Sequence, residues 1–224
     1  VEKKCGWMYE THHTDGSIGK INYVVWSDVF ICPDCGNEIV YWNEAYDAEK
    51  GLMKEIIACP KCGSTHEKKE LDKCWVTSFD NECKQTVRTV KAVPIFLNYT
   101  AIDGKKYKKE PDNFDLANIE KIKNLQIKTW IPIDKIPEGD KMSDPINKGV
   151  VFVHQFYEKR SLIVLSELWN RLDIYQKRIL TNCISRNATK MNRFVVNKYN
   201  PNGRINGPFT GTLYLPSEIV EQNI

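Results

Sequence analysis

The chain has 224 residues, of which 42% are hydrophobic and 27% are charged, a balance typical of a globular protein with a buried core. No apolar run approaches the roughly 20 residues that a membrane-spanning helix needs, and no secretory signal is visible in the polar start of the chain. These features indicate a cytoplasmic protein without a membrane partner. The first residue is Val1 rather than Met, so we expect a segment of a longer protein.

Residues 1–30 predict a β-rich lead-in. Gly16 and Gly19 are typical of a turn, and the β-branched and aromatic residues 21–26 predict a strand. His12 and His13 precede this turn. Neighbouring side chains on an extended segment point to opposite faces, so the two histidines do not readily chelate one ion. We expect a loop that hydrogen-bonds a ligand or phosphate rather than a catalytic pair.

Residues 31–70 contain four of the eight cysteines, arranged as two Cys-Pro-x-Cys-Gly knuckles. In a chain without secretion signals this spacing favours metal binding over disulfides, and the glycine after each pair permits a tight turn. Four thiolates form a closed tetrahedral cage that suits a structural Zn²⁺. The predicted zinc ligands are Cys32, Cys35, Cys59 and Cys62. An iron centre, a pair of redox motifs and unligated thiols are the alternatives. His66 could replace a cysteine as ligand, but because four thiolates already fill the site it is expected on the surface.

The rest of this module and the next segment, residues 71–149, predict mostly strands and turns. The predicted strands are 38–42, 56–58, 75–77 and 87–99, with a turn at 47–51. Pro94 interrupts the last strand and belongs at an edge or a bulge. Asp115 is the expected N-cap of a short helix over 116–123, and residues 131–147 predict an ordered, proline-containing connector.

Residues 150–224 predict a helical and basic segment. A short strand at 150–153 precedes apolar residues that recur at helical spacing between Leu162 and Ile179, which predicts one long helix. Residues 200–203 predict a turn, and residues 212–215 predict a strand. Between residues 174 and 217 there are seven basic residues and no acidic one, which suits a polyanion such as nucleic acid; a solvated basic face is the alternative.

Six cations are the candidate nucleic-acid contacts. Lys159 and Arg160 follow Phe156 and Tyr157, aromatic residues that could stack on a base while the cations meet phosphates; core packing of both rings is the alternative. The others lie in the basic stretch, where arginine side chains can also contact guanine edges. The full set is Lys159, Arg160, Arg186, Lys190, Arg193 and Arg204.

No complete catalytic motif is present. The chain lacks a glycine-rich phosphate loop with its lysine, a Gly-x-Ser-x-Gly elbow and a His-Glu-x-x-His helix. Residues 209–212 imitate part of a cofactor-binding Phe-x-Gly-x-Gly motif, but position 213 is Leu. Residues 143–147 imitate part of Asp-Pro-Pro-Tyr without the second proline. We therefore predict no catalytic residue in this chain.

Several segments in a fixed order carry a resemblance to a known family. They are residues 9–16, residues 21–30, the two cysteine knuckles, residues 154–160 and residues 211–216. The chain resembles the middle region of large bacterial and archaeal DNA methylases, which transfer a methyl group from S-adenosylmethionine to an exocyclic adenine or cytosine nitrogen. Because neither motif that does this chemistry is complete here, the resemblance implies a non-catalytic segment with a zinc ribbon and DNA contacts.

Together these observations predict an α+β fold, in which a zinc ribbon is inserted in a mixed domain with short β-sheets and one long helix. The predicted function is DNA binding or target recognition within a DNA methyltransferase, with DNA and the remainder of that chain as partners. S-adenosylmethionine would serve the parent enzyme only, and the isolated chain is predicted to be inactive. The alternative is a zinc-ribbon scaffold or protein-interaction module, which salt-dependent DNA binding would distinguish.

Overall fold

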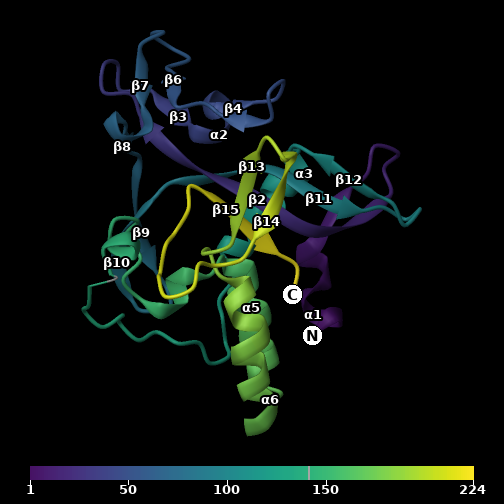
Figure 1. Ribbon diagram of the computed structural model, residues 1–224. Helices are drawn as coiled ribbons and strands as arrows, with labels where there is room; N and C mark the ends of the chain where they lie inside the picture. Colours follow the sequence, from purple (N-terminus) through teal and green to yellow (C-terminus); the bar gives the residue numbers. More distant parts are fainter. Residues whose placement is uncertain (141) are drawn as a thin grey trace.

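The fold is organised around one long strand, β2 (Ile18–Ile31), in a computed structural model that describes residues 1–140 and 142–224 (Figure 1). Its main neighbours are β11 (Ala92–Thr100) on one edge and β15 (Glu218–Gln222) on the other, both antiparallel. Within the described residues the strand order is β12–β11–β2–β15–β13–β14. The outer strands are β12 (Lys106–Lys109), β13 (Arg193–Asn197) and β14 (Asn200–Asn206).

Shorter strands complete the β structure. Three of them also pair with β2: β1 (Glu10–His12), β3 (Glu38–Val40) and β8 (Asp72–Lys73). The remaining strands form two-stranded ribbons: β4 (Tyr46–Asp47) with β5 (Leu52–Met53), β6 (Ile56–Ala58) with β7 (Thr65–Glu67), and β9 (Trp75–Asp80) with β10 (Gln85–Val90). Strand β2 therefore joins the main sheet to the cysteine module, because β3 and β8 pair with its last residues.

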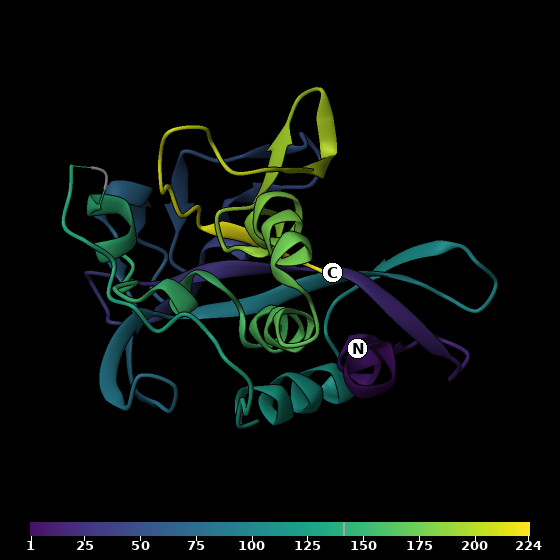
Figure 2. The same ribbon diagram turned by 90° about the horizontal axis from the view of Figure 1, so that it is seen from below.

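Helices lie beside the sheet rather than within it. The α-helices are α1 (Glu2–Cys5), α2 (Tyr41–Ala45), α3 (Asn113–Lys123), α4 (Ser143–Ile146), α5 (Lys159–Trp169) and α6 (Ile174–Ile179). Single turns of other helix types are η1 (Gly6–Tyr9), η2 (Lys68–Glu70), η3 (Val153–Phe156), η4 (Leu180–Ile184) and η5 (Ser185–Ala188). Helices α3 and α5 contact each other, and α6 projects away from the body (Figures 1 and 2). No helix in the described part of the chain is long and apolar enough to cross a membrane.

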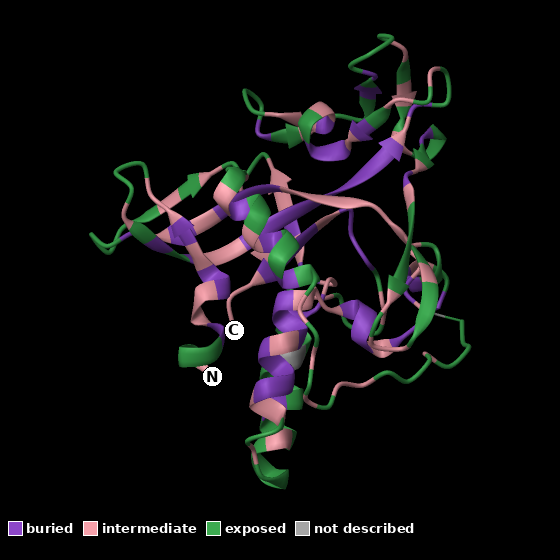
Figure 3. Cartoon of the chain, turned by 180° about the vertical axis from the view of Figure 1, so that it is seen from behind, coloured by how far each residue is buried: buried purple, intermediate pink, exposed green. Residues whose placement is uncertain are grey.

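The alternation of side chains along β2 explains its central place. Val24 and Trp26 face a core that includes residues of α3 and α5. Val25, between them, faces an aromatic cluster on the other side with Trp42 and Phe194. Both faces of the strand are thus covered, as its buried middle in Figure 3 shows. A strand buried on both faces reads as a continuous apolar run, which is the pattern at residues 24–26.

The expected fold class is confirmed at the level of a mixed α and β structure, but two of its details differ. The β structure is dominated by one curled antiparallel sheet rather than several short ones. The expected long helix is divided into α5 and α6. The division follows from Asp173, whose carboxylate accepts hydrogen bonds from the backbone N–H groups of Tyr175 and Gln176 and so caps a new helix.

Several local expectations are corrected by tertiary structure. Strand β3 ends at Val40, and residues 41–42 begin α2. Residues 150–153 and 212–215 lie outside the strands. Strand β15 was not predicted because it is short and three of its five residues are acidic or amide. Residues 200–203 belong to β14 rather than a turn. The register shift between Pro94 and Phe96 confirms the predicted bulge.

The helix expected after Asp115 begins three residues earlier, at Asn113. Its N-cap is Asp112, which accepts a hydrogen bond from the Asp115 N–H, while the Asp115 carboxylate accepts from the Asp112 N–H. Asp115 is buried and also accepts a 2.6 Å hydrogen bond from the Thr11 hydroxyl. The reciprocal capping box explains why the sequence pointed to the right helix but the wrong cap. Of the expected connector 131–147, position 141 lies outside the described residues.

Candidate metal centre and nucleic-acid interface

Two matching turns position the four cysteines. Cys32 follows directly on the last residue of β2, so the first knuckle is mounted on the central strand. In each knuckle the glycine N–H donates to the carbonyl of the first cysteine, from Gly36 to Cys32 and from Gly63 to Cys59, at 2.9 Å. Both glycines have positive φ, +69° and +76°, a conformation that other residues adopt at a cost. The glycines thus allow each pair of sulfurs to face the other.

The four sulfurs lie close together. Their Sγ atoms are all within 4.8 Å of one another. The Cys32 and Cys62 sulfurs are 3.7 Å apart, and those of Cys35 and Cys59 are 3.6 Å apart. A tetrahedral ion with metal–sulfur bonds of about 2.3 Å holds its sulfurs about 3.8 Å apart. The predicted set is therefore brought together in an arrangement compatible with a structural metal site.

The electrostatics of the cluster favour a bound cation. Hydrogen bonding with Ser64 lowers the pKa of Cys32 to about 6 and is the main cause of the lowered pKa of Cys62. The Asn37 N–H favours the Cys35 thiolate, but lost hydration and the neighbouring sulfurs raise the pKa of Cys35 to about 12. Four thiolates this close repel one another, and a divalent cation removes that conflict.

His66 lies beside the sulfur cluster rather than on the open surface. Its side chain is only 12% exposed, which corrects the surface position expected from the sequence. Nε2 lies 3.0 Å from the Ser64 hydroxyl, 3.1 Å from an Asp34 carboxylate oxygen and 4.0 Å from the Cys32 sulfur. His66 thus holds the serine that contacts two of the cysteines, and it supports the cluster from outside.

Three of the six predicted nucleic-acid contacts are engaged by carboxylates. Lys159 lies 2.5 Å from Glu82, and Lys190 lies 3.3 Å from Glu158; both lysines are half-buried. Arg160 is a clear correction: it is 3% exposed, and its Nε lies 3.6 Å from a Glu221 oxygen. Arg160 lies at the start of α5 and points into the core, where Glu221 of β15 is its counter-charge. The aromatic partners are also inside, since Phe156 is buried and Tyr157 half-buried.

The other three predicted contacts are brought together around the β13–β14 hairpin. Arg193 and Arg204 share one face, since Arg204 pairs with Val195, two positions after Arg193. The Arg193 guanidinium lies 3.5 Å from the centroid of the Phe209 ring. Arg186 donates a 3.1 Å hydrogen bond to the Pro208 carbonyl. Two arginines therefore hold the loop that presents Phe209, which is 48% exposed.

Comparisons with protein-family models, curated proteins and solved structures gave no match.

The neighbouring histidines His12 and His13 have local packing partners. The His12 ring stacks on Phe114 with centroids 4.0 Å apart. His13 Nδ1 lies 2.7 Å from the Tyr99 hydroxyl. These contacts tie the β1–β2 turn to α3 and β11.

One polar cluster escaped the sequence analysis. Asp80, Cys83 and His154 each offer a ligand atom within 4.8 Å of the other two. The Asp80 and His154 side chains line a pocket of about 450 Å³. Asp80 and Cys83 show an Asp-x-x-Cys spacing, which parallels the cysteine knuckles, but His154 is remote in sequence. Only the fold brings His154 next to Asp80 and Cys83.

Proposed function

We propose that this chain is a DNA-binding, non-catalytic segment of a DNA methyltransferase, in which zinc stabilises the region around the four cysteines. Methyl transfer, and the binding of S-adenosylmethionine, would belong to flanking parts of the parent enzyme. The class of parent enzyme rests on the resemblance of the quoted segments, whereas DNA binding rests on the charges and geometry of the C-terminal region.

Zinc is the metal that best suits the cysteine cluster. Four thiolates complete its tetrahedral shell, so the ion would have no position for a substrate. Its role would be to close the module formed by β3, β6 and β7 at the end of β2. The small apolar cluster of this module, which includes Phe30, Ile39 and Ile57, is limited in size, and domains of this kind draw stability from their metal.

The observation that carries the DNA-binding proposal is a set of cations without counter-charges. Among the described residues, six of the seven basic side chains between positions 174 and 217 have no carboxylate within 4.0 Å. They are Lys177, Arg178, Arg186, Arg193, Lys198 and Arg204. Cations that are not neutralised internally are the ones that exchange their counterions for phosphates.

Exposed aromatic rings accompany these cations. Phe209 lies against Arg193, Tyr199 at the tip of the β13–β14 hairpin is 79% exposed, and Tyr214 is 39% exposed. Guanidinium groups for phosphates combined with rings for bases are the usual composition of a nucleic-acid surface. An unstacked or flipped base would find a ring here, in keeping with enzymes that modify a base outside the duplex.

Fluorescence-polarisation titration of a duplex DNA at several salt concentrations tests the proposal. With phosphate contacts from Arg186, Arg193 and Arg204, the log–log salt slope should be about −2.7, or roughly a 500-fold loss of affinity for a tenfold rise in salt. The double variant Arg186→Glu/Arg204→Glu should make the slope shallower by about 1.8. The matched control is Lys105→Glu/Lys106→Glu, an equal charge change on exposed residues of the β11–β12 hairpin, which should leave the slope unchanged.

A scaffold or protein-interaction role without DNA binding is the second candidate. It is favoured by one observation: α6 exposes apolar side chains, with Ile174 60%, Tyr175 72% and Ile179 62% exposed. The same titration separates the two functions. If the folded wild-type protein shows no salt-dependent binding to duplex DNA, or if both double variants weaken binding equally, the scaffold function is the better one.

A further inference from the structure

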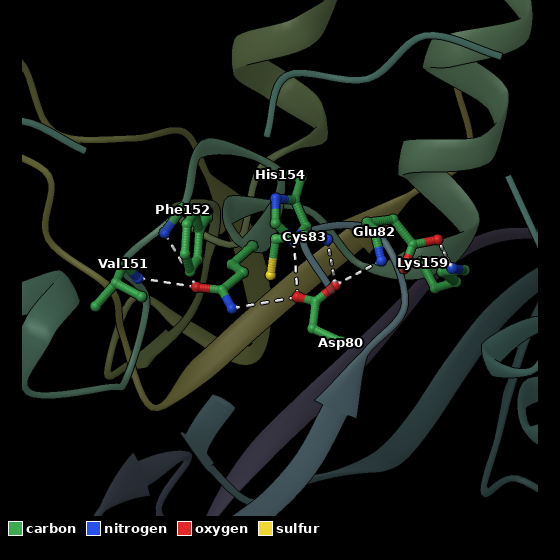
Figure 4. A network of polar contacts seen from close by, with 8 residues as sticks. Asp80, Glu82, Cys83, Val151, Phe152, His154 and Lys159 are labelled. Carbon is green, nitrogen blue, oxygen red and sulfur yellow. Dashed lines mark hydrogen bonds and ion pairs between the residues drawn. The ribbon is translucent and has the colours of Figure 1, made fainter. Parts of the chain in front are cut away.

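The cluster of Asp80, Cys83 and His154 lies where a hairpin meets a helical turn (Figure 4). Asp80 is the last residue of β9, and Cys83 lies in the turn before β10. One Asp80 oxygen, Oδ1, accepts hydrogen bonds from the N–H groups of Glu82 at 2.9 Å and Cys83 at 3.3 Å. This turn fixes the carboxylate and brings the Cys83 sulfur to the same side.

The second Asp80 oxygen faces His154 from η3. His154 Nε2 lies 2.8 Å from Asp80 Oδ2. Gln155 supports the pair: its Oε1 accepts from the N–H groups of Val151 at 2.8 Å and Phe152 at 3.1 Å, which turns its Nε2 toward Asp80 Oδ2 at 3.4 Å. The imidazole is therefore held from the helical side and the carboxylate from the hairpin side, before any ligand arrives.

We propose that Asp80, Cys83 and His154 form a second metal site, which binds Zn²⁺ or a similar divalent transition metal through one oxygen, one sulfur and one nitrogen. These are the three ligand types that zinc accepts in proteins. Unlike the four-cysteine cluster, the set supplies three ligands. The fourth position is left to water or a small ligand from the pocket of about 450 Å³ that Asp80 and His154 line.

Charge and burial support this assignment. With the thiol and carboxylate ionised and the histidine neutral, the site carries two negative charges, which a divalent ion neutralises. Glu82, which lines the same pocket, is already paired with Lys159. His154 is 5% exposed, so an ion bound at Nε2, the nitrogen that faces Asp80, would be largely shielded from water.

Metal binding requires small movements of the ligands. A tetrahedral ion with bonds of about 2.0 Å to nitrogen and oxygen separates those atoms by about 3.3 Å, compared with 2.8 Å between Nε2 and Oδ2 here. The carboxylate would give way by a few tenths of an ångström and exchange its hydrogen bond for a metal bond. Cys83 is on a turn and half-buried, so it is the ligand that can move.

Zinc content of the purified full chain, grown with added zinc and without chelators, tests the site. We expect two zinc ions per chain in the wild type and one in Cys83→Ser. The matched control is Cys183→Ser, which changes an exposed cysteine outside both clusters and should retain two. Asp80→Asn is a second variant, because its amide oxygen can still accept the turn hydrogen bonds; it should also retain one.

A spectroscopic measurement needs no variant. In the cobalt-substituted wild-type protein, imidazole should shift the visible d–d bands of the open site, while the bands of a four-thiolate site stay unchanged. One zinc ion in the wild type, together with a cobalt spectrum that imidazole does not alter, would overturn the proposal. So would two zinc ions in both Cys83→Ser and Asp80→Asn. The experiment is independent of DNA binding and of the parent enzyme.

Discussion

Replacing Arg160 with Met tests whether this cation belongs to the core rather than to the DNA-facing surface. The side chains of Arg160 and Glu221 are 4% and 2% exposed, and among the described residues Glu221 keeps one other polar partner, the Trp26 indole N–H at 3.1 Å. Methionine fills a similar volume but leaves the carboxylate without its counter-charge. Removing one partner of a buried ion pair costs about 3–5 kcal/mol. For a chain of this length, that loss lowers Tm by roughly 6–20 °C.

The loss of stability in Arg160→Met should depend on pH, and the burial of Glu221 gives the direction. Burial raises the pKa of Glu221, and Arg160 opposes this rise. Without Arg160 the pKa rises further, so the folded variant holds a proton that the unfolded chain releases. Stability then falls as the pH rises through the interval between the unfolded and folded pKa values. The deficit of Arg160→Met should therefore be smaller near about pH 5 than near about pH 8.

Urea denaturation of both proteins at the two pH values measures this effect. The control is Arg204→Met, an exposed arginine on β14, which should change the free energy of unfolding by less than about 0.5 kcal/mol while weakening DNA binding. Arg160→Met should lower the free energy of unfolding and should leave DNA binding unchanged under conditions where the variant is folded. If Arg160→Met is as stable as the control and weakens DNA binding equally, Arg160 acts at the surface and the argument from burial is wrong.

Three further predictions concern the metal, the cofactor and the backbone. Cys35→Ser should release the metal and increase hydrogen exchange across residues 31–66 while α5 keeps its protection; retained zinc in a folded variant would contradict this. Calorimetric titration of the isolated chain with S-adenosylmethionine should show no binding, and saturable one-to-one binding at micromolar affinity would show that a cofactor site was missed. Gly149→Ala should destabilise the protein more than Gly104→Ala. Both positions have positive φ, but a Cβ at Gly149 would lie 1.9 Å from the Arg88 carbonyl oxygen, whereas Gly104 has open space. Gly104→Ala, the control, should lower the free energy of unfolding by about 1–2 kcal/mol. Equal losses for the two variants in urea denaturation would refute the steric argument.

The cysteine cluster could be predicted from the sequence because its pattern is local. A Cys-Pro-x-Cys-Gly knuckle contains its own turn, so two copies define the ligands without knowledge of the fold. The division between α5 and α6 was also readable in principle, because Asp173 and Gln176 form a capping box inside the apolar stripe. The apolar periodicity outweighed this signal, although Ile179 at the end of the stripe is 62% exposed.

Positions that depend on remote partners could not be predicted. Arg160 and Lys159 look alike as cations at a helix start, and only the arrival of β15 places Glu221 beside Arg160. The Asp80–His154 contact joins residues 74 positions apart. Sequence shows which groups carry charge, but whether a cation is neutralised inside the protein depends on which strand ends next to it.

The placement of β15 has a consequence for how the protein reaches its fold. This strand lies between β2 and β13 in the sheet, yet it comes from the far end of the chain; Trp26 and Glu221, which it brings together, are 195 positions apart. During synthesis β2 can pair with β11 early, while its other edge waits until residue 222 has left the ribosome. Folding that depends on such distant pairing is slow, and an open edge on an apolar strand invites association with other chains. Nascent chains released before β15 emerges should therefore aggregate or remain bound to chaperones.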